Sequence, residues 1–167
     1  VAEAEKFARN YQMAVGIGWV KDEGKFCENR YSIVTPEGEI LEYTKLHPFS
    51  YSGEDRYFQG GTVLPVCEYR GYHLGVQICY DLRFPETFQA LSRQADLILV
   101  PANWPGRRRE HWISLLQARA IENQSYIAGV NCVGDMDGQT YTGDSRLYGP
   151  DGALCSGETL MPADAQT

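Results

Sequence analysis

The sequence predicts a single mixed α/β domain. Three observations support this fold class: 43% of the 167 residues are hydrophobic, hairpin patterns dominate before Cys79, and strands alternate with helices after it. A chain of this length buries enough apolar surface for one core. The alternation predicts a sheet of mixed strand direction that helices cover on one face.

Before Cys79, the sequence pattern predicts a helix, a buried strand, a hairpin, a long loop and a second pair of strands. The buried strand is rich in β-branched residues, and a Pro-Glu-Gly turn suits the hairpin. The loop has no hydrophobic period, as is common for loops that carry function. In order, the ranges are helix 2–11, strand 13–20, strands 31–34 and 40–43, loop 47–61, and strands 63–69 and 72–79.

The part after Cys79 predicts a βαβ unit and then further alternation. Pro85 is suited to the first turn of a helix, and the apolar run that follows is typical of a parallel strand buried on both faces. In order, the ranges are helix 86–93, strand 96–100, helix 108–122, strand 125–133, a turn cluster at 134–138, strand 145–148, a turn at 149–152 and a short strand at 153–154.

Composition argues against several function classes. The net charge of −7 disfavours binding to nucleic acid or to an anionic membrane, and the only basic run is Arg107 to Arg109. No apolar stretch is long enough to span a bilayer, and the first residues do not resemble a signal peptide. Five cysteines without short spacing indicate a reducing cytosol and predict no metal site.

Cys79 is the most suggestive candidate for chemistry. It follows an apolar strand and precedes a turn into a helix, a position that exposes a nucleophile beside backbone N–H groups. On this segment alone, an inert core cysteine is the more frequent role. The usual partner base would be His47, His73 or His111, and none stands out.

Two further features could line a site. Lys45 at a strand end and Glu54 in the long loop offer a cation for an oxyanion and a carboxylate to position it, although such pairs are more often solvated surface pairs. Trp104, just after another strand, could wall a pocket or belong to the core.

Three separated motifs resemble the carbon–nitrogen hydrolase (nitrilase) superfamily. They are YTKLHPFSYSGE, GVQICYDLRFPE, and ANWP followed by HWISLLQARAIENQSYIAGVN, and they occur in the family's order and spacing. The runs CYDLRFPE and ARAIENQ and the GDSR segment at 143–146 most resemble the omega-amidase branch. The resemblance implies an α-β-β-α sandwich for one partial domain over residues 1–167, without a cofactor, that self-associates as a homodimer or higher homo-oligomer.

Carried over by motif, Cys79 is the nucleophile, Lys45 the catalytic lysine and Glu54 the second glutamate. The backbone N–H of Tyr80 would join Lys45 in holding the oxyanion. The family's first glutamate, which acts as general base, lies in an upstream motif that these residues lack. The resemblance therefore implies an internal portion of a longer enzyme, short at both ends.

The resemblance implies an amidase that acts on a small dicarboxylic acid monoamide such as 2-oxoglutaramate through a cysteine thioester. The substrate carboxylate would need a cation, for which Arg107 and Arg108 beside Trp104 are candidates, although solvated surface arginines are the more frequent case. Another amide or nitrile hydrolase of the superfamily, or a catalytically incomplete scaffold, stays open. A flavodoxin-like ligand-binding domain is disfavoured because no glycine-rich phosphate loop is present.

Overall fold

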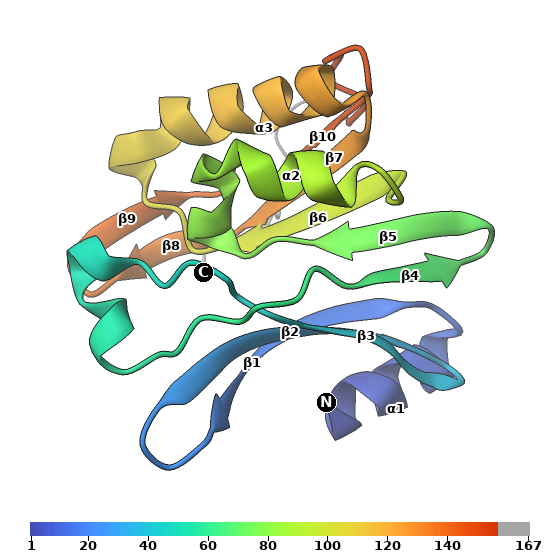
Figure 1. Cartoon of the computed structure of the whole chain (residues 1–167), viewed down its shortest axis with the longest axis horizontal. Coiled ribbons are helices and arrows are strands. Elements are labelled where there is room, and N and C mark those ends of the chain that lie inside the picture. The colour runs from blue at the N-terminus through green and yellow to red at the C-terminus, as the bar shows by residue number, and fades with distance from the viewer. Residues whose placement is uncertain (157–167) are drawn as a thin grey trace.

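The computed structural model describes residues 1–156 and shows four layers, in the order helix, sheet, sheet, helices (Figure 1). The expected α-β-β-α arrangement of a mixed α/β chain is thus confirmed for this part. The helices and strands are α1 (Ala2–Tyr11), β1 (Val15–Asp22), β2 (Cys27–Thr35), β3 (Gly38–Thr44), β4 (Val66–Tyr69), β5 (Tyr72–Val76), α2 (Pro85–Leu91), β6 (Leu97–Ala102), α3 (Arg109–Asn123), β7 (Tyr126–Asn131), β8 (Val133–Met136), β9 (Gln139–Thr142) and β10 (Arg146–Tyr148).

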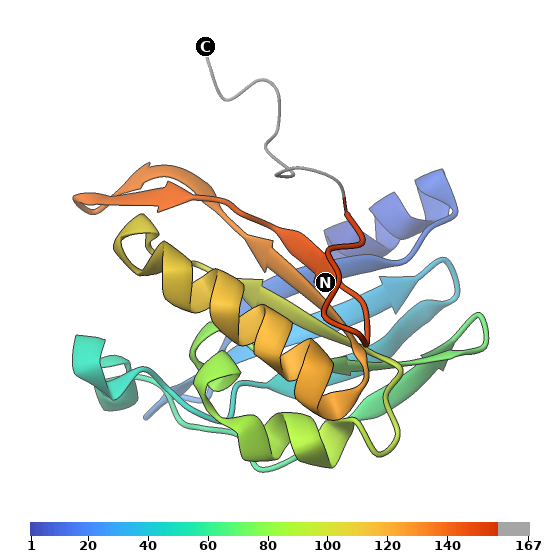
Figure 2. The ribbon, with the colours of Figure 1, turned by 90° about the horizontal axis from the view of Figure 1, so that it is seen from above.

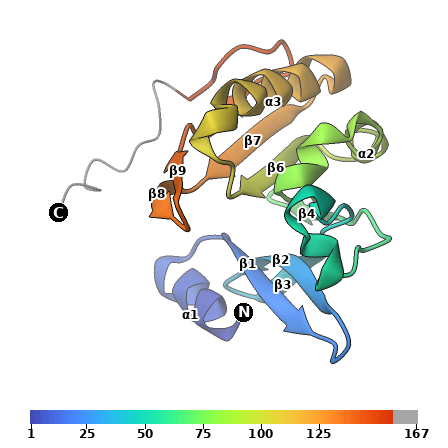
Figure 3. The same ribbon diagram turned by 90° about the vertical axis from the view of Figure 1, so that its left-hand side faces the viewer.

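The first sheet is an antiparallel meander in the order β1-β2-β3. Strand β1 lies two residues later than predicted, and its partner β2 begins at Cys27 rather than Tyr31, so the two strands pair along eight residues of each. Helix α1 covers the outer face of this sheet through Ala4 and Ala8, which pack against Val34 (Figure 3). Small residues on the helix allow it to lie close to the strands.

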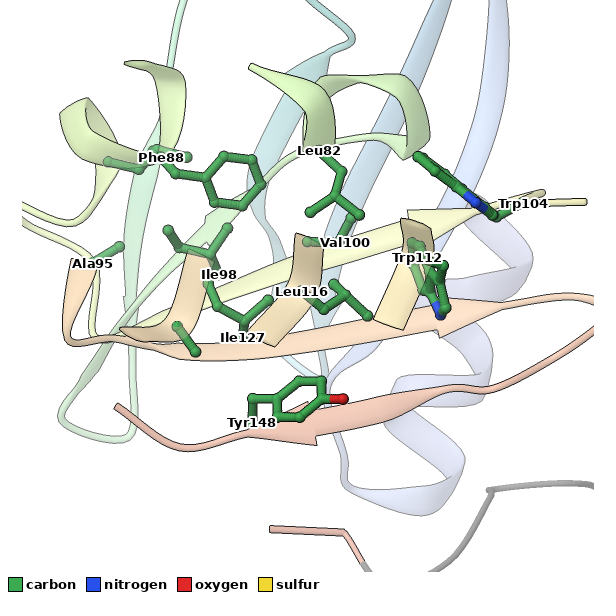
Figure 4. Packing of buried hydrophobic residues seen from close by; sticks show 12 residues of the cluster. Leu82, Phe88, Ala95, Ile98, Val100, Trp104, Trp112, Leu116, Ile127 and Tyr148 are labelled. Carbon is green, nitrogen blue, oxygen red and sulfur yellow. The ribbon is translucent and has the colours of Figure 1, made fainter. Parts of the chain in front are cut away.

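The second sheet has five strands in the order β10-β7-β6-β5-β4. Strands β5, β6 and β7 are parallel, and the two edge strands are antiparallel to their neighbours, so the predicted mixed sheet is confirmed. Helices α2 and α3 lie over its outer face (Figure 2). Between helices and sheet lies the largest core cluster, which includes Phe88, Ile98, Trp112 and Leu116 (Figure 4).

The two sheets pack against each other through a second apolar cluster. Ile33, Leu41 and Tyr43 from the meander meet Leu74 and Val76 from β5. The early hairpins therefore form a separate layer. Their arrangement opposite the five-stranded sheet followed from the family resemblance and not from the hydrophobic pattern.

Other local predictions also differ from the structure. The predicted strand 63–69 begins only at Val66, the predicted strand 72–79 ends at Val76, so that Cys79 lies beyond it, and the predicted strand 125–133 is divided into β7 and β8. The predicted turn cluster at 134–138 is a hairpin, because β8 and β9 pair around a turn at Asp137 and Gly138. The predicted loop at 47–61 contains two short 3₁₀ helices, Ser50–Ser52 and Glu54–Arg56. The predicted last strand is a single bridge between Tyr148 and Leu154.

Within residues 1–156, no helix is both long and apolar enough to cross a bilayer. The C-terminal segment, to which the resemblance assigns subunit contacts, lies partly outside the described residues.

Candidate active site

A cavity of about 750 Å³ opens at the carboxyl ends of β5 and β6. Ligand sites in α/β folds form beyond this edge of the sheet because the strand-end loops converge there. All seven residues that the sequence singled out line this one cavity: Lys45, Glu54, Cys79, Tyr80, Trp104, Arg107 and Arg108. None of the three histidines is among its lining residues.

Cys79 lies in a sharp turn just after β5. Its backbone has φ of 49°, a left-handed conformation that is unusual for a residue with a side chain and that costs about 1–3 kcal/mol. The next residue, Tyr80, lies at the beginning of the short 3₁₀ helix Cys79–Arg83. Because the first N–H groups of a helix have no acceptor within it, the Tyr80 N–H can face a ligand.

The buried carboxylate of Asp81 holds this turn in place. One of its oxygens accepts hydrogen bonds from the Tyr43 hydroxyl at 2.8 Å and the Ile78 N–H at 2.9 Å. The other accepts the His47 N–H at 2.9 Å and contacts His47 Nδ1 at 2.8 Å. The Asp81 carboxylate is therefore hydrogen-bonded both to the residue before the left-handed turn at Cys79 and to the segment after Lys45.

The Tyr43 hydroxyl extends this network beneath the turn. It accepts hydrogen bonds from the Leu46 N–H at 3.2 Å and Gln77 Nε2 at 3.1 Å. Burial, and then the charge of Asp81 with its hydrogen bond, raise the pKa of Tyr43 well above its ordinary value. The hydroxyl therefore stays protonated and acts as a fixed donor.

Lys45 and Glu54 form an ion pair in the lining of the cavity. Lys45 Nζ lies 2.6 Å from Glu54 Oε2, and the two side chains are 5% and 16% exposed. Glu54 also accepts hydrogen bonds from the Phe49 N–H at 2.6 Å and from Asn29 Nδ2 at 3.2 Å. The expected pairing is thus present, but it is largely buried and is not a solvated surface pair.

Opposing effects set the acidity of the two reactive groups. Burial raises the pKa of Glu54, but the hydrogen bonds from Lys45 and Phe49 and the charge of Lys45 outweigh it, so the pKa is lowered overall. Burial also raises the pKa of the Cys79 thiol, and the charge of Lys45 offsets only part of this rise. The thiol is therefore protonated at neutral pH, and it needs a base before it can attack.

The loop after β6 forms the wall beside Cys79. The thiol donates toward the carbonyl oxygen of Asn103, with Sγ 4.0 Å away. Asn131 at the end of β7 holds this loop, because its Oδ1 accepts the Trp104 N–H at 2.7 Å and its Nδ2 donates to the Trp104 carbonyl at 3.0 Å. The Trp104 indole donates to the Arg108 carbonyl at 2.8 Å and is almost fully buried.

The two predicted arginines line the cavity from the segment after Trp104. Arg107 is exposed, and Arg108 lies over the rings of Phe49 and Tyr51 at 5.5 and 5.7 Å. A third arginine, Arg83, lines the same cavity and was not singled out from the sequence, although it belongs to the CYDLRFPE motif.

Asp81 and Asn131 were missed as well. Both occur in motifs that carry the resemblance, but their roles depend on backbone groups that are distant in sequence.

The arrangement suits nucleophilic attack on a carbonyl group. A thiol, a buried ammonium and the beginning of a short helix line one cavity. An ammonium and a backbone N–H can stabilise a developing oxyanion.

Comparisons with known proteins agree with this geometry. The sequence profile described as carbon-nitrogen hydrolase matches residues 1–161. An omega-amidase of Yersinia enterocolitica is 48% identical over 120 residues, which cover 71% of this chain and 46% of that protein. A 2-oxoglutaramate amidase of Bacillus subtilis is 38% identical over 128 residues, covering 75% and 49%. The chain thus spans about half the length of these curated relatives.

Solved structures share the fold. A Xanthomonas campestris protein of the CN-hydrolase superfamily, with an arsenic adduct in its active site, superposes with a TM-score of 0.87 at 32% identity and covers 93% of this chain and 62% of that one. An amidase variant from Nesterenkonia, with the acetamide moiety of fluoroacetamide added at its active-site cysteine, has a TM-score of 0.84 at 27% identity, covering 91% and 59%.

Proposed function

This chain belongs to the carbon-nitrogen hydrolase family, and we propose that the protein hydrolyses the terminal amide of a small carboxylic acid monoamide to the acid and ammonia. The observation that carries the proposal is the buried Lys45–Glu54 pair in the same cavity as Cys79. The named relatives support an amide as the substrate, and the Nesterenkonia amidase supports a cysteine as the reacting residue.

In the proposed first step, the Cys79 sulfur attacks the amide carbonyl carbon after losing its proton. The carbonyl oxygen becomes an oxyanion, which the Lys45 ammonium and the Tyr80 N–H stabilise. The carbon–nitrogen bond then breaks, nitrogen leaves as ammonia after taking up a proton, and the acyl group stays on sulfur as a thioester. Water hydrolyses the thioester, which releases the acid and restores the thiol.

Glu54 acts in this scheme as a positioning residue for Lys45. Its carboxylate accepts three hydrogen bonds, and its lowered pKa makes it a weak base. It is therefore poorly suited to remove the thiol proton. The resemblance assigns that step to a glutamate upstream of the matched motifs, so the proposal concerns the full-length protein.

The omega-amidase relatives and the arginines that line the cavity support a narrower substrate class. We infer a dicarboxylic acid monoamide such as 2-oxoglutaramate, which carries a carboxylate at the far end from the amide. The competing hypothesis of a catalytically incomplete scaffold predicts no ammonia release from any amide. Cytosolic location and homo-oligomeric assembly stay predictions from sequence.

Ammonia release by the full-length protein tests the proposal. The wild type is expected to release ammonia from 2-oxoglutaramate, and Cys79→Ala is expected to release none. Cys132→Ala is the matched control, because Cys132 is also a half-buried free cysteine but does not line the cavity. Ammonia release by Cys79→Ala at the wild-type rate would contradict the proposal, as would inactivity of the wild type on all monoamides tested.

A further inference from the structure

The β8–β9 hairpin forms part of the cavity wall, through Gln139 and Tyr141, and stands apart from the two main sheets. In the described part of the chain, its two strands pair only with each other. The hairpin extends beyond the carboxyl end of β7 (Figure 1). An isolated two-stranded hairpin is only marginally stable in water, so its position depends on the contacts at its base.

Strand β9 packs tightly against residues 104–108, which contribute to the lining of the same cavity. A Cβ atom added at Gly106 would lie 2.8 Å from Thr142 Cγ2 and 3.1 Å from the Thr140 carbonyl oxygen. Both distances are shorter than the 3.4–4 Å of ordinary van der Waals contact. The two parts of the wall are therefore in direct contact, without space for a methyl group between them.

The carboxylate of Asp144 joins these two parts of the wall at their ends. Arg109, which directly follows residues 104–108, donates to both carboxylate oxygens, through Nε at 2.9 Å and Nη2 at 2.8 Å. Thr142, the last residue of β9, donates its hydroxyl to the same carboxylate at 3.0 Å. A two-point contact between arginine and carboxylate fixes geometry more strictly than a single hydrogen bond does.

Asp144 is itself anchored to the core. It is 3% exposed, and its carbonyl oxygen accepts the indole N–H of the buried Trp112 at 2.8 Å. The preceding carbonyl, of Gly143, accepts Asn131 Nδ2 at 2.8 Å. Burial raises the pKa of Asp144, but the hydrogen bonds from Arg109 and Thr142 and the charge of Arg109 outweigh it, so the pKa is lowered overall. The carboxylate is therefore ionised at neutral pH.

We propose that Asp144 is a positioning residue that holds the β8–β9 hairpin against residues 104–108 and thereby limits the length of the acyl chain that the cavity accepts. The inference rests on the proposed function, because the acyl chain is that of the amide substrate. Asp144 acts through Arg109 and Thr142, since it is not among the described residues that line the cavity. Loosening the contact opens a gap between the two parts of the wall, into which a longer chain can extend.

Two substitutions loosen this contact by different causes. Asp144 has φ of 59°, a left-handed conformation that asparagine tolerates, so Asp144→Asn keeps the backbone. The side chain of Arg109 is 41% exposed and can be hydrated when the carboxylate charge is lost. Gly106→Ala adds a methyl group for which there is no space. Gly106 is not among the glycines with positive φ, so alanine meets no backbone strain there.

Kinetics of the full-length protein on a four-carbon and a six-carbon monoamide test the proposal. The measured quantity is the ratio of kcat/KM for adipamate to kcat/KM for succinamate. Asp144→Asn is expected to raise this ratio about 10-fold or more, the discrimination typical of one methylene group in a close-fitting pocket, and Gly106→Ala should raise it as well. Asp135→Asn is the matched control, because Asp135 lies on the same hairpin, accepts the Thr140 hydroxyl and does not line the cavity.

A merely structural role of Asp144 would lower kcat/KM for both monoamides equally and leave the ratio unchanged. An unchanged ratio in Asp144→Asn would therefore overturn the inference, as would an equal rise in Asp135→Asn.

Amide hydrogen exchange, followed by mass spectrometry, separates this inference from the proposed function because it needs no turnover. The amides of residues 133–142 should exchange about 10- to 100-fold faster in Asp144→Asn than in the wild type, the range expected for losing a charged hydrogen bond. Faster exchange supports the contact even if the wild type hydrolyses neither monoamide. Exchange at the wild-type rate in Asp144→Asn would overturn the inference, whether or not the protein is an amidase.

Discussion

Replacing Lys45 by methionine removes one buried charge while keeping most of the side-chain volume. Lys45 is 4% exposed, and its ammonium is one of three donors to Glu54. Breaking a buried ion pair from one side typically costs about 3–5 kcal/mol, because the remaining charge stays buried. Glu54 keeps two donors and is partly exposed, so we expect a loss near the lower end, about 3 kcal/mol at pH 7.

The pH dependence of this loss follows from the pKa of Glu54. In the wild type this pKa is below its ordinary value of 4.5, so ionised Glu54 contributes stability that is present above that value and is lost as the pH falls through the lowered pKa. In Lys45→Met the burial that raises this pKa and the hydrogen bonds from Phe49 and Asn29 that lower it remain, but the hydrogen bond and charge of Lys45 are lost, so the pKa of Glu54 is higher than in the wild type. The variant's deficit is therefore largest at neutral pH and smaller at pH 4.

Urea unfolding at pH 7 and pH 4 measures both effects. Adding Glu54→Gln to Lys45→Met should recover most of the lost stability, because it removes the buried carboxylate charge that has lost its cationic partner. An equal deficit at the two pH values, or no recovery in the double variant, would refute this reasoning. In the full-length protein, Lys45→Met should also lower kcat by about 10²–10³-fold, the usual effect of losing one oxyanion donor.

Three further outcomes are expected. Tyr43→Phe removes one donor to Asp81, leaves the Leu46 N–H without its acceptor, and leaves Gln77 Nε2 with the Val76 carbonyl alone, so urea unfolding should show a loss of roughly 2–3 kcal/mol; a loss below the error of the fit would contradict the network. Asn131→Ala frees the backbone of Trp104, and steady-state kinetics should show kcat lowered by about 10- to 100-fold, with partial rescue in Asn131→Asp, which keeps the acceptor. Equal kcat values in both variants would argue against a positioning role. Alkylation of Cys79 by iodoacetamide should need a higher pH in Lys45→Met than in the wild type, because the charge of Lys45 lowers the pKa of the thiol. Alkylation rates with the same pH dependence in both proteins would contradict this.

The regular elements were predictable where local signals were strong. Pro85 begins α2 in the structure, as its missing N–H and fixed φ favour, and the apolar run before Pro101 is a parallel strand. The β8–β9 hairpin was missed although Asp137-Gly138 is a strong hairpin signal, with φ of 50° and 71°. Within the predicted turn 134–138, only Asp137 and Gly138 form the turn, and the residues before them belong to β8.

The site was predictable in its residues but not in its contacts. Cys79, Lys45 and Glu54 could be placed in one site because their motifs resemble a known family. The burial of the lysine–glutamate pair could not be anticipated, because it depends on how the loop at 47–61 folds back over the meander. The contacts of Arg83 and Asn131 with Trp104 could not be anticipated either, because only tertiary packing brings these residues together.

In the proposed reaction, Cys79 carries the acyl group during amide hydrolysis. Rapid acid quenching of the full-length protein during turnover of 2-oxoglutaramate, followed by peptide mass spectrometry, would trap this intermediate. We expect a thioester on the peptide that contains Cys79, and no such adduct in Cys79→Ala. Ammonia release accompanied by an acyl group on a different residue, or sustained in Cys79→Ala, would contradict it.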